Sequence, residues 1–456
     1  MKTNNKNYFQ IYEEAVSFLH NALDYEKLIS YQYNASTFSL DRMEKFLAYV
    51  ENPHKNFPSV HITGTKGKGS TAIMISTILE NAGLTTGLFT SPHIIDLKER
   101  IQINHRHISE ADFISCISIL RPYIQQLQET EPKASPTFFE ILTVIGMLYF
   151  KMRQVSMAVL EVGLGGRLDS TNVVIPQVSV ITNIGLDHTS ILGNTLSEIA
   201  YEKAGIIKKG VPVVSAVDKP AALSVIDKTC RAKDAKLYLL GKDILIEKAQ
   251  NVEKDGTRGL LCTIQTWHQT YENIFLPVVG IHQAKNCALA LGAMDILQEQ
   301  GYLSIDEKII RKALAQAHCP ARIEVVSKKP LILLDFSHTA ESMRFLKKTI
   351  LENFVFHHLI LVLGFSRDKD LNAILKEIVP VGDKIIVTQS KNPRAALPED
   401  LCRSIEKING IRPEILPGIQ DAVIKAKRIA SPEDLICITG SVYVAGEAKQ
   451  ALRLAL

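Results

Sequence analysis

The stretch that decides the fold is Ser59–Ser70, SVHITGTKGKGS. Its first five residues form a short, largely apolar run, as in a buried strand, and its last seven form a glycine-rich turn. The residues that follow, Thr71–Asn81, are typical of a helix. A glycine-rich turn lets backbone N–H groups approach phosphate oxygens, and the helix N-terminus adds partial positive charge. The sequence therefore predicts a phosphate-binding loop in which Lys68 reaches the terminal phosphates of a nucleotide and Ser70 ligates Mg²⁺.

This loop departs from the strict P-loop pattern, because a glycine separates the lysine from the serine. The alternative interpretation is a flexible surface turn, and the strand–loop–helix context argues against it. We expect Gly67, Lys68, Gly69 and Ser70 to hold the nucleotide.

The composition of the 456 residues is that of an ordinary globular protein, with 46% hydrophobic and 22% charged residues. The length predicts two domains or three. The net charge of +4 is small, which argues against a nucleic-acid-binding protein and suits an enzyme with anionic substrates.

Neither a secretion signal nor a membrane span is expected. Met1–Gln10 is polar, and the apolar stretch Ile141–Phe150 is shorter than the roughly 20 residues that a bilayer requires. The seven cysteines form no CxxC pair, which predicts buried thiols in a reducing compartment. The sequence therefore predicts a soluble, cytoplasmic protein.

Strand-like runs alternate with helical stretches along the whole chain, which indicates an α/β fold with a largely parallel sheet. Met157–Val162 and Val178–Thr182 are further strands, and each runs into a polar loop. A smaller copy of the same architecture follows, with strands predicted at Leu331–Asp335, Leu359–Leu363, Lys384–Thr388 and Leu435–Thr439. We place the domains at residues 1–320 and 321–456.

Two polar groups at strand ends suit a hard cation. Glu161 ends one strand and opens the glycine-rich segment EVGLGGRLDSTN, and His188 in GLDH follows the parallel strand Val178–Thr182. Such strand-end loops meet at one edge of a sheet, where Mg²⁺ takes oxygen ligands. For Glu161 the alternative is a solvated acid that caps a turn, and for His188 a surface residue. Lys203, on a helix in EKAGI, reads from the sequence alone as a solvated or ion-paired lysine.

These motifs together are similar to those of the folylpolyglutamate synthase/dihydrofolate synthase family, within the superfamily of Mur ligases. The segment EVGLGGRLDSTN differs from the family signature only at Ser170. The resemblance implies a P-loop-type, parallel-sheet ATPase domain followed by a smaller Rossmann-like α/β domain. It also implies that Glu161 and His188 ligate Mg²⁺ and that Lys203 is carbamylated by CO₂, which turns a cation into an anionic ligand.

The resemblance assigns two further sets of residues. The acid substrate, a pteroate or folate, would be bound by Thr137, Phe138, Phe139, Glu140, Leu168, Asp169 and Ser170. The nucleotide would be bound from the far side by Asn286, Arg322, Asp335 and His338. Paired aromatic residues at a helix start are also a common feature of cores, so the two phenylalanines keep that alternative.

The activity implied by the resemblance is ATP-dependent amide ligation through an acyl phosphate. ATP phosphorylates a pteroate or folate carboxylate, and the amine of L-glutamate attacks it. Lys68, Lys203 and His188 would be the catalytic groups, with two Mg²⁺ ions and a monovalent cation such as K⁺ as candidate cofactors. A monomer without nucleic-acid or membrane partners is expected. Whether the product is dihydrofolate, a polyglutamate or both stays open.

Two stretches depart from the family pattern. The family usually has asparagine at Lys66, and DFSHTA at Asp335–Ala340 replaces its DGAHNP and is closer to the DYAHTP of some peptidoglycan ligases. These departures favour a related ligase with a different carboxylate substrate. The segments Gly364–Asp370, Asn392–Ala395 and Thr439–Tyr443 match the folate branch again. A nucleotide-binding paralogue without catalysis is the remaining alternative.

Overall fold

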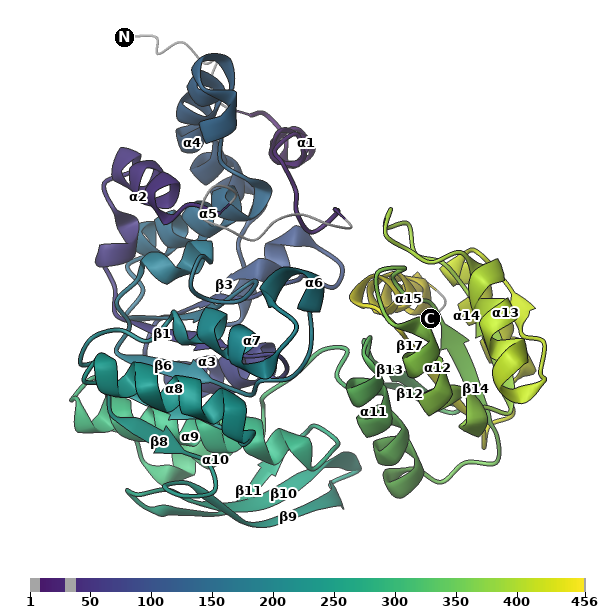
Figure 1. The fold of residues 1–456 in the computed structure, drawn as a ribbon. Coiled ribbons are helices and arrows are strands. Elements are labelled where there is room, and N and C mark those ends of the chain that lie inside the picture. Colours follow the sequence, from purple (N-terminus) through teal and green to yellow (C-terminus); the bar gives the residue numbers. More distant parts are fainter. Residues whose placement is uncertain (1–8, 29–37, 455–456) are drawn as a thin grey trace.

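The N-terminal part of the chain is built on an eight-stranded sheet. The computed structural model describes residues 9–28 and 38–454, and Figure 1 shows two bodies side by side. The first sheet has the order β4-β3-β2-β5-β1-β6-β7-β8. Its strands are β1 (Ser59–Thr63), β2 (Thr86–Phe89), β3 (Ile101–Ile103), β4 (Arg106–His107), β5 (Met157–Glu161), β6 (Val178–Ile181), β7 (Val213–Ser215) and β8 (Leu237–Leu239).

The predicted largely parallel sheet is confirmed, and β1 lies at its centre. β1 pairs in parallel with β5 on one side and with β6 on the other. Only the pairs β2–β3 and β3–β4, at one side of the sheet, are antiparallel. Because all five residues of β1 are buried, the strand that carries the phosphate loop is held on both faces and both edges.

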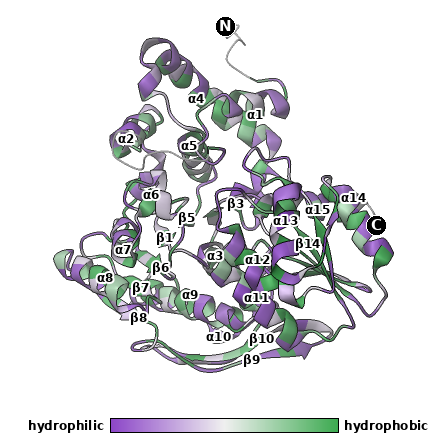
Figure 2. Ribbon diagram, turned by 45° about the vertical axis from the view of Figure 1, so that its right-hand side comes forward, coloured by the Kyte–Doolittle hydropathy of each residue, from purple (hydrophilic) through white to green (hydrophobic). Residues whose placement is uncertain are grey.

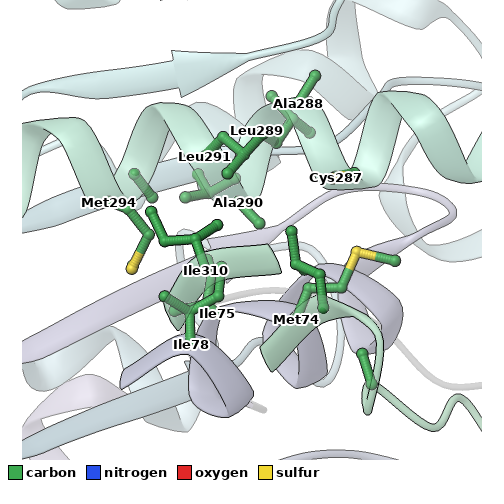
Figure 3. Packing of buried hydrophobic residues seen from close by; sticks show 14 of the residues in the cluster. Met74, Ile75, Ile78, Cys287, Ala288, Leu289, Ala290, Leu291, Met294 and Ile310 are labelled. Carbon is green, nitrogen blue, oxygen red and sulfur yellow. The ribbon is translucent and has the colours of Figure 1, made fainter. Parts of the chain in front are cut away.

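Helices cover both faces of this sheet. Alternate residues of β5 enter opposite cores, as the two-residue period of a strand requires. One core contains α3 (Lys68–Asn81), α9 (His282–Glu299) and α10 (Glu307–Leu314). Figure 3 shows Met74, Ile75 and Ile78 of α3 packed below α9, with Ile310 of α10 beside them. The other face is covered by α1 (Tyr12–His20), α2 (Leu40–Tyr49), α4 (Glu110–Thr130) and α5 (Phe138–Met152).

A three-stranded antiparallel sheet, which the sequence did not lead us to expect, packs under α9 and α10. Its strands are β9 (Leu245–Lys254), β10 (Thr257–Gln265) and β11 (Thr270–Leu276), and β10 is central. Figure 1 shows it as the lowest layer of the N-terminal body. Two further helices, α7 (Leu196–Ala204) and α8 (Pro220–Ala232), pack together over the β6–β7 side of the main sheet.

The C-terminal body is a six-stranded sheet of order β12-β13-β17-β14-β15-β16. The strands are β12 (Glu324–Lys328), β13 (Leu331–Leu334), β14 (Leu359–Leu363), β15 (Lys384–Val387), β16 (Glu414–Ile415) and β17 (Leu435–Thr439), and all pairs except β12–β13 are parallel. One face carries α11 (Ala340–Asn353), α12 (Leu371–Ile378) and α13 (Pro398–Asn409), and the other α14 (Ile419–Ile429) and α15 (Val442–Leu454). In Figure 2 the strands around β14 are hydrophobic, because helices cover both faces.

The two bodies touch through polar, backbone and apolar contacts, and Val279 of the first packs in a core of the second with Leu333 and Met343. Arg394 Nη1 donates to the carbonyl oxygen of Glu26 at 3.0 Å. Gly446 of α15 lies against the backbone of Ile94, where an added side chain would have no room. All seven cysteines are buried and unpaired, as predicted. Among the helices of the described residues, none combines the length and the apolar character needed to cross a bilayer.

Candidate active site

A cavity of about 700 Å³ lies where the two bodies meet. On the N-terminal side it begins at the carboxyl ends of β1, β5 and β6, which is where open parallel sheets bind ligands. On the C-terminal side the loops after β13, β14 and β17 close it. A nucleotide and a second substrate can therefore meet between walls that belong to different parts of the chain.

The phosphate loop is held in a conformation that only glycine adopts easily. Gly64 and Gly67 have φ values of 151° and 87°, and a side chain at Gly67 would collide with Asn286. The Thr182 hydroxyl donates to the Lys66 carbonyl at 2.6 Å, which fixes the middle of the loop. Helix α3 begins at Lys68, three residues earlier than predicted, so its first turn belongs to the loop.

Two lysine ammonium groups share one carbonyl oxygen in this loop. Lys68 Nζ donates to the Gly64 oxygen at 3.2 Å, and Lys203 Nζ of α7 donates to the same oxygen at 2.9 Å. Burial and then the nearby Lys68 lower the pKa of Lys203 to about 7. A large fraction of Lys203 is therefore an uncharged, nucleophilic amine at neutral pH.

Glu161 and His188 line the same cavity, as the sequence predicts. Glu161 Oε2 accepts the Ser91 N–H at 3.1 Å, while Oε1 has no hydrogen bond within the described part of the chain. Burial raises the pKa of Glu161, with Lys68 and the Ser91 N–H opposing. His188 precedes the short helix α6 (Thr189–Leu192). Desolvation in the cavity lowers the pKa of His188, so its ring is neutral and has a free lone pair.

This donor set suits a hard cation that retains other ligands. Within the described ranges, no three His, Cys, Asp or Glu side chains gather into a complete metal cage. Mg²⁺ is commonly held by one or two carboxylates, with substrate phosphates and water completing the octahedron. Ser70, the other predicted ligand, is buried at the first turn of α3, beside the Cys319 thiol.

Asp187 joins the two bodies and was not predicted as a site residue. Its carboxylate accepts from Lys66 Nζ at 2.8 Å and pairs with Lys369 Nζ of the C-terminal body at 3.3 Å. Lys66 Nζ also lies 3.1 Å from His338 Nε2. Against the effect of burial, Lys66 and His338 hold the pKa of Asp187 well below its usual range. Lys66, a departure from the family pattern, is thus a bridge between the bodies.

The linker to the C-terminal body places Arg322 at the cavity wall. Its guanidinium carbon lies 3.8 Å from the centre of the Phe336 ring. Asp335 is buried and accepts the Ile323 N–H at 3.2 Å and the Ser337 N–H at 2.6 Å. Asp335 therefore shapes the backbone around Arg322.

The opposite end of the cavity is walled by the start of α5. Thr137 and Glu140 form a capping box, and Arg42 of α2 donates to Glu140 through Nε and Nη2 at 2.7–3.1 Å. Ser170 Oγ and Thr143 Oγ1 are 2.7 Å apart. Arg42 has no sequence signal that identifies it, because its partner lies 98 residues away.

The cavity brings together most of the predicted site residues. It is lined by Gly67, Lys68, Thr137, Phe139, Glu140, Glu161, Leu168, Asp169, Ser170, His188, Arg322 and His338. Phe138 does not line it, because its ring packs in the hydrophobic core and stacks on His20 at 5.5 Å. Lys203 lines a smaller pocket behind the loop, which Lys68 and His188 also reach. Gly69, Ser70, Asn286 and Asp335 support the wall without lining it.

Comparison with known protein families shows the class of protein to which the chain belongs. Residues 62–294 match the Mur ligase middle domain, and residues 321–442 match the glutamate ligase domain of Mur ligases. With the phosphate loop and the cavity between the bodies, these matches define an ATP-dependent ligase of the Mur type.

Proteins that are similar over nearly the whole length of the chain show its family. A dihydrofolate synthase/folylpolyglutamate synthase of Bacillus subtilis is 34% identical over 98% of this chain and 100% of its own length. The folylpolyglutamate synthase of Lacticaseibacillus casei is 33% identical over 97% of this chain and 98% of its own. The chain belongs to the folylpolyglutamate synthase/dihydrofolate synthase family.

Solved structures agree with this assignment. Mycobacterium tuberculosis folylpolyglutamate synthase complexed with ADP superposes with a TM-score of 0.87 at 29% identity, over 96% of this chain and 97% of the other. A folylpolyglutamate synthase complex with AMPPCP and folate gives a TM-score of 0.82 at 30% identity, over 97% of this chain and 100% of the other. The predicted fold class and family are confirmed.

Proposed function

We propose that this chain uses ATP to join L-glutamate to the carboxylate of a pteroate or a folate. The observation that carries the proposal is the single cavity that connects the phosphate loop to the wall formed by Phe139, Glu140 and Ser170. Close relatives of the chain are named dihydrofolate synthase, folylpolyglutamate synthase or both.

The reaction would begin with transfer of the terminal phosphoryl group of ATP to the substrate carboxylate. Lys68 and Arg322 would neutralise charge on the transferred group from opposite walls of the cavity. The amine of glutamate would then attack the acyl phosphate, and phosphate would leave. Closure of the two bodies would exclude water from this intermediate.

Mg²⁺ fits the donor set of the cavity. Glu161 offers a carboxylate oxygen that no described residue occupies, and His188 offers a neutral ring nitrogen. Ser70 and a carbamylated Lys203 would complete the protein ligands for two ions. When bound, Mg²⁺ neutralises phosphate charge and orients the phosphate chain.

Carbamylation of Lys203 is supported by its environment. The amine must be uncharged to react with CO₂, and the burial that lowers its pKa to about 7 provides this form. The product would carry a negative charge beside Lys68, which also donates to the Gly64 carbonyl. Attraction to that neighbouring ammonium would stabilise the carbamate.

We also propose that the domains divide at residues 320 and 321, next to the linker that carries Arg322, and that the enzyme is a monomer of the cytoplasm. The two departures Lys66 and Phe336 support a second candidate, a ligase of the same chemistry with a different carboxylate. Both residues line the cavity, so they could alter what it accepts.

Phosphate release tests the proposal. Purified protein receives Mg·ATP and L-glutamate with either dihydropteroate or tetrahydrofolate, and each component is omitted in turn. Release that requires both glutamate and a pterin acid supports the folate ligase, and the preferred acid identifies the branch. If protein that still binds ATP releases no phosphate with either acid, the proposal is refuted, and another carboxylate substrate or a non-catalytic paralogue is favoured. Lys68→Met is the matched control for phosphoryl transfer.

A further inference from the structure

The guanidinium of Arg322 faces the cavity without a protein acceptor. Arg322 has no hydrogen bond or ion pair with any residue that the structure describes, and the ring of Phe336 is its one close aromatic partner there. A guanidinium carries five N–H donors in a fixed plane. Both residues line the cavity, so these donors are available to an anion bound inside it.

The backbone on both sides of Arg322 is held in an unusual conformation. Ala321 and Ile323 each have a φ of 52°, in the left-handed region that non-glycine residues rarely adopt. For a β-branched residue such as Ile323 this conformation is costly, and it persists only where the surroundings enforce it. Asp335 supplies part of that enforcement by accepting the Ile323 N–H.

Phe336 contacts the side chain of Arg322, whereas Asp335 holds the neighbouring backbone. Phe336 follows Asp335 directly in one short loop, so the carboxylate that holds the backbone and the ring that contacts the guanidinium come from adjacent residues. An arginine stacked at 3.8 Å keeps its N–H edges free, because the attraction uses the face of the plane.

We propose that Phe336 is a positioning residue, which orients the Arg322 guanidinium so that its N–H edge meets the phosphate oxygens of the bound nucleotide. The proposal rests on the ATP-dependent activity and not on the identity of the acid substrate. It assigns to Phe336 a role that is exerted through Arg322.

Direct binding of Mg·ATP, measured by calorimetry without acid substrate or glutamate, tests the proposal. Phe336→Leu keeps an apolar side chain but removes the ring, and we expect it to weaken ATP binding by roughly 3- to 30-fold. Phe336→Tyr keeps the ring and should bind ATP as the unchanged chain does. Binding of adenosine, which has no phosphate, should be the same in all three proteins. In steady-state assays the KM for ATP should rise with a smaller change in kcat.

A double-mutant cycle separates positioning from a general structural role. In an Arg322→Met background, Phe336→Leu should cause no further loss of ATP affinity. Full ATP affinity in Phe336→Leu, or an undiminished loss in the Arg322→Met background, would overturn the proposal. If Phe336→Leu does not fold, as judged by thermal unfolding, Phe336→Met provides the same comparison. Because the assay uses nucleotide alone, failure of the folate assignment would leave its result interpretable.

Discussion

Gly446 lets helix α15 approach the N-terminal body. Its replacement by alanine should lower the activity without lowering the stability. An ideal Cβ at Gly446 would collide with the carbonyl oxygen of Ile94 and lie 2.9 Å from its carbonyl carbon. A carbon needs about 3.3 Å from a carbonyl oxygen, so the helix would have to retreat by about 1 Å. Both contact atoms belong to backbone, which cannot rotate away as a side chain can.

The two consequences of Gly446→Ala have opposite signs. Inside a helix, alanine is favoured over glycine by about 1 kcal/mol, so the C-terminal domain should be as stable as before or more so. A displacement of about 1 Å in the cavity wall should lower kcat/KM on the order of 100-fold, because reacting groups must be closely aligned. Urea unfolding measures the stability, and phosphate release measures kcat/KM.

A control on the same helix sharpens this test. Gln450 is exposed on α15, so Gln450→Ala changes the helix without touching the contact and should keep full activity. Full activity in Gly446→Ala would refute the reasoning, because the close approach would then not govern the reaction. A parallel loss of stability and activity would also refute it, since the variant would be misfolded rather than displaced.

Three further results are expected. The pKa of Lys203 is lowered to about 7, so its uncharged fraction rises as the pH increases through 7. Activation of CO₂-depleted enzyme by bicarbonate should therefore rise over the same pH range. If bicarbonate does not activate the unchanged chain, carbamylation is contradicted. Lys66→Asn removes the ammonium group that lies 3.1 Å from His338 Nε2 of the C-terminal body and that also pairs with Asp187. Small-angle scattering should then show less compaction with nucleotide, while an unchanged profile would exclude a bridging role. Glu26→Ala leaves the buried guanidinium of Arg100 without its bidentate carboxylate, so urea unfolding should show a loss of about 3–5 kcal/mol, with a smaller loss in Glu26→Gln.

The local sequence was sufficient to predict the strand and the helix that carry the phosphate loop. β1 has the bounds that its apolar run predicts, and the helix after the loop ends where predicted. Thr195 and Glu198 form the capping box that opens α7. Each of these features depends on neighbours within a few residues, so the sequence contains all of the relevant physical information.

Other features depend on partners that are distant in the sequence. Asp187 lies 121 residues from Lys66 and 182 from Lys369, and no local pattern connects them. The sheet β9–β11 escaped prediction because most residues of β9 are exposed or partly exposed, so its strand has no clear apolar face. Phe138 and Phe139 are adjacent and chemically alike, and only their directions from α5 separate a core residue from a cavity residue.

Several contacts that join the two bodies are charged or made by backbone, whereas most apolar side chains pack in cores within one body, with Val279 packed in a core of the other. Interfaces of this kind between domains resemble transient ones, and their free energy changes with ionic strength and bound charge. The apolar side chains therefore mainly stabilise each half, and the lysines, arginines and acids contribute to the contact between the halves. Exchange of a few of these charges would change the free energy of the contact between the halves and leave most of the apolar cores intact.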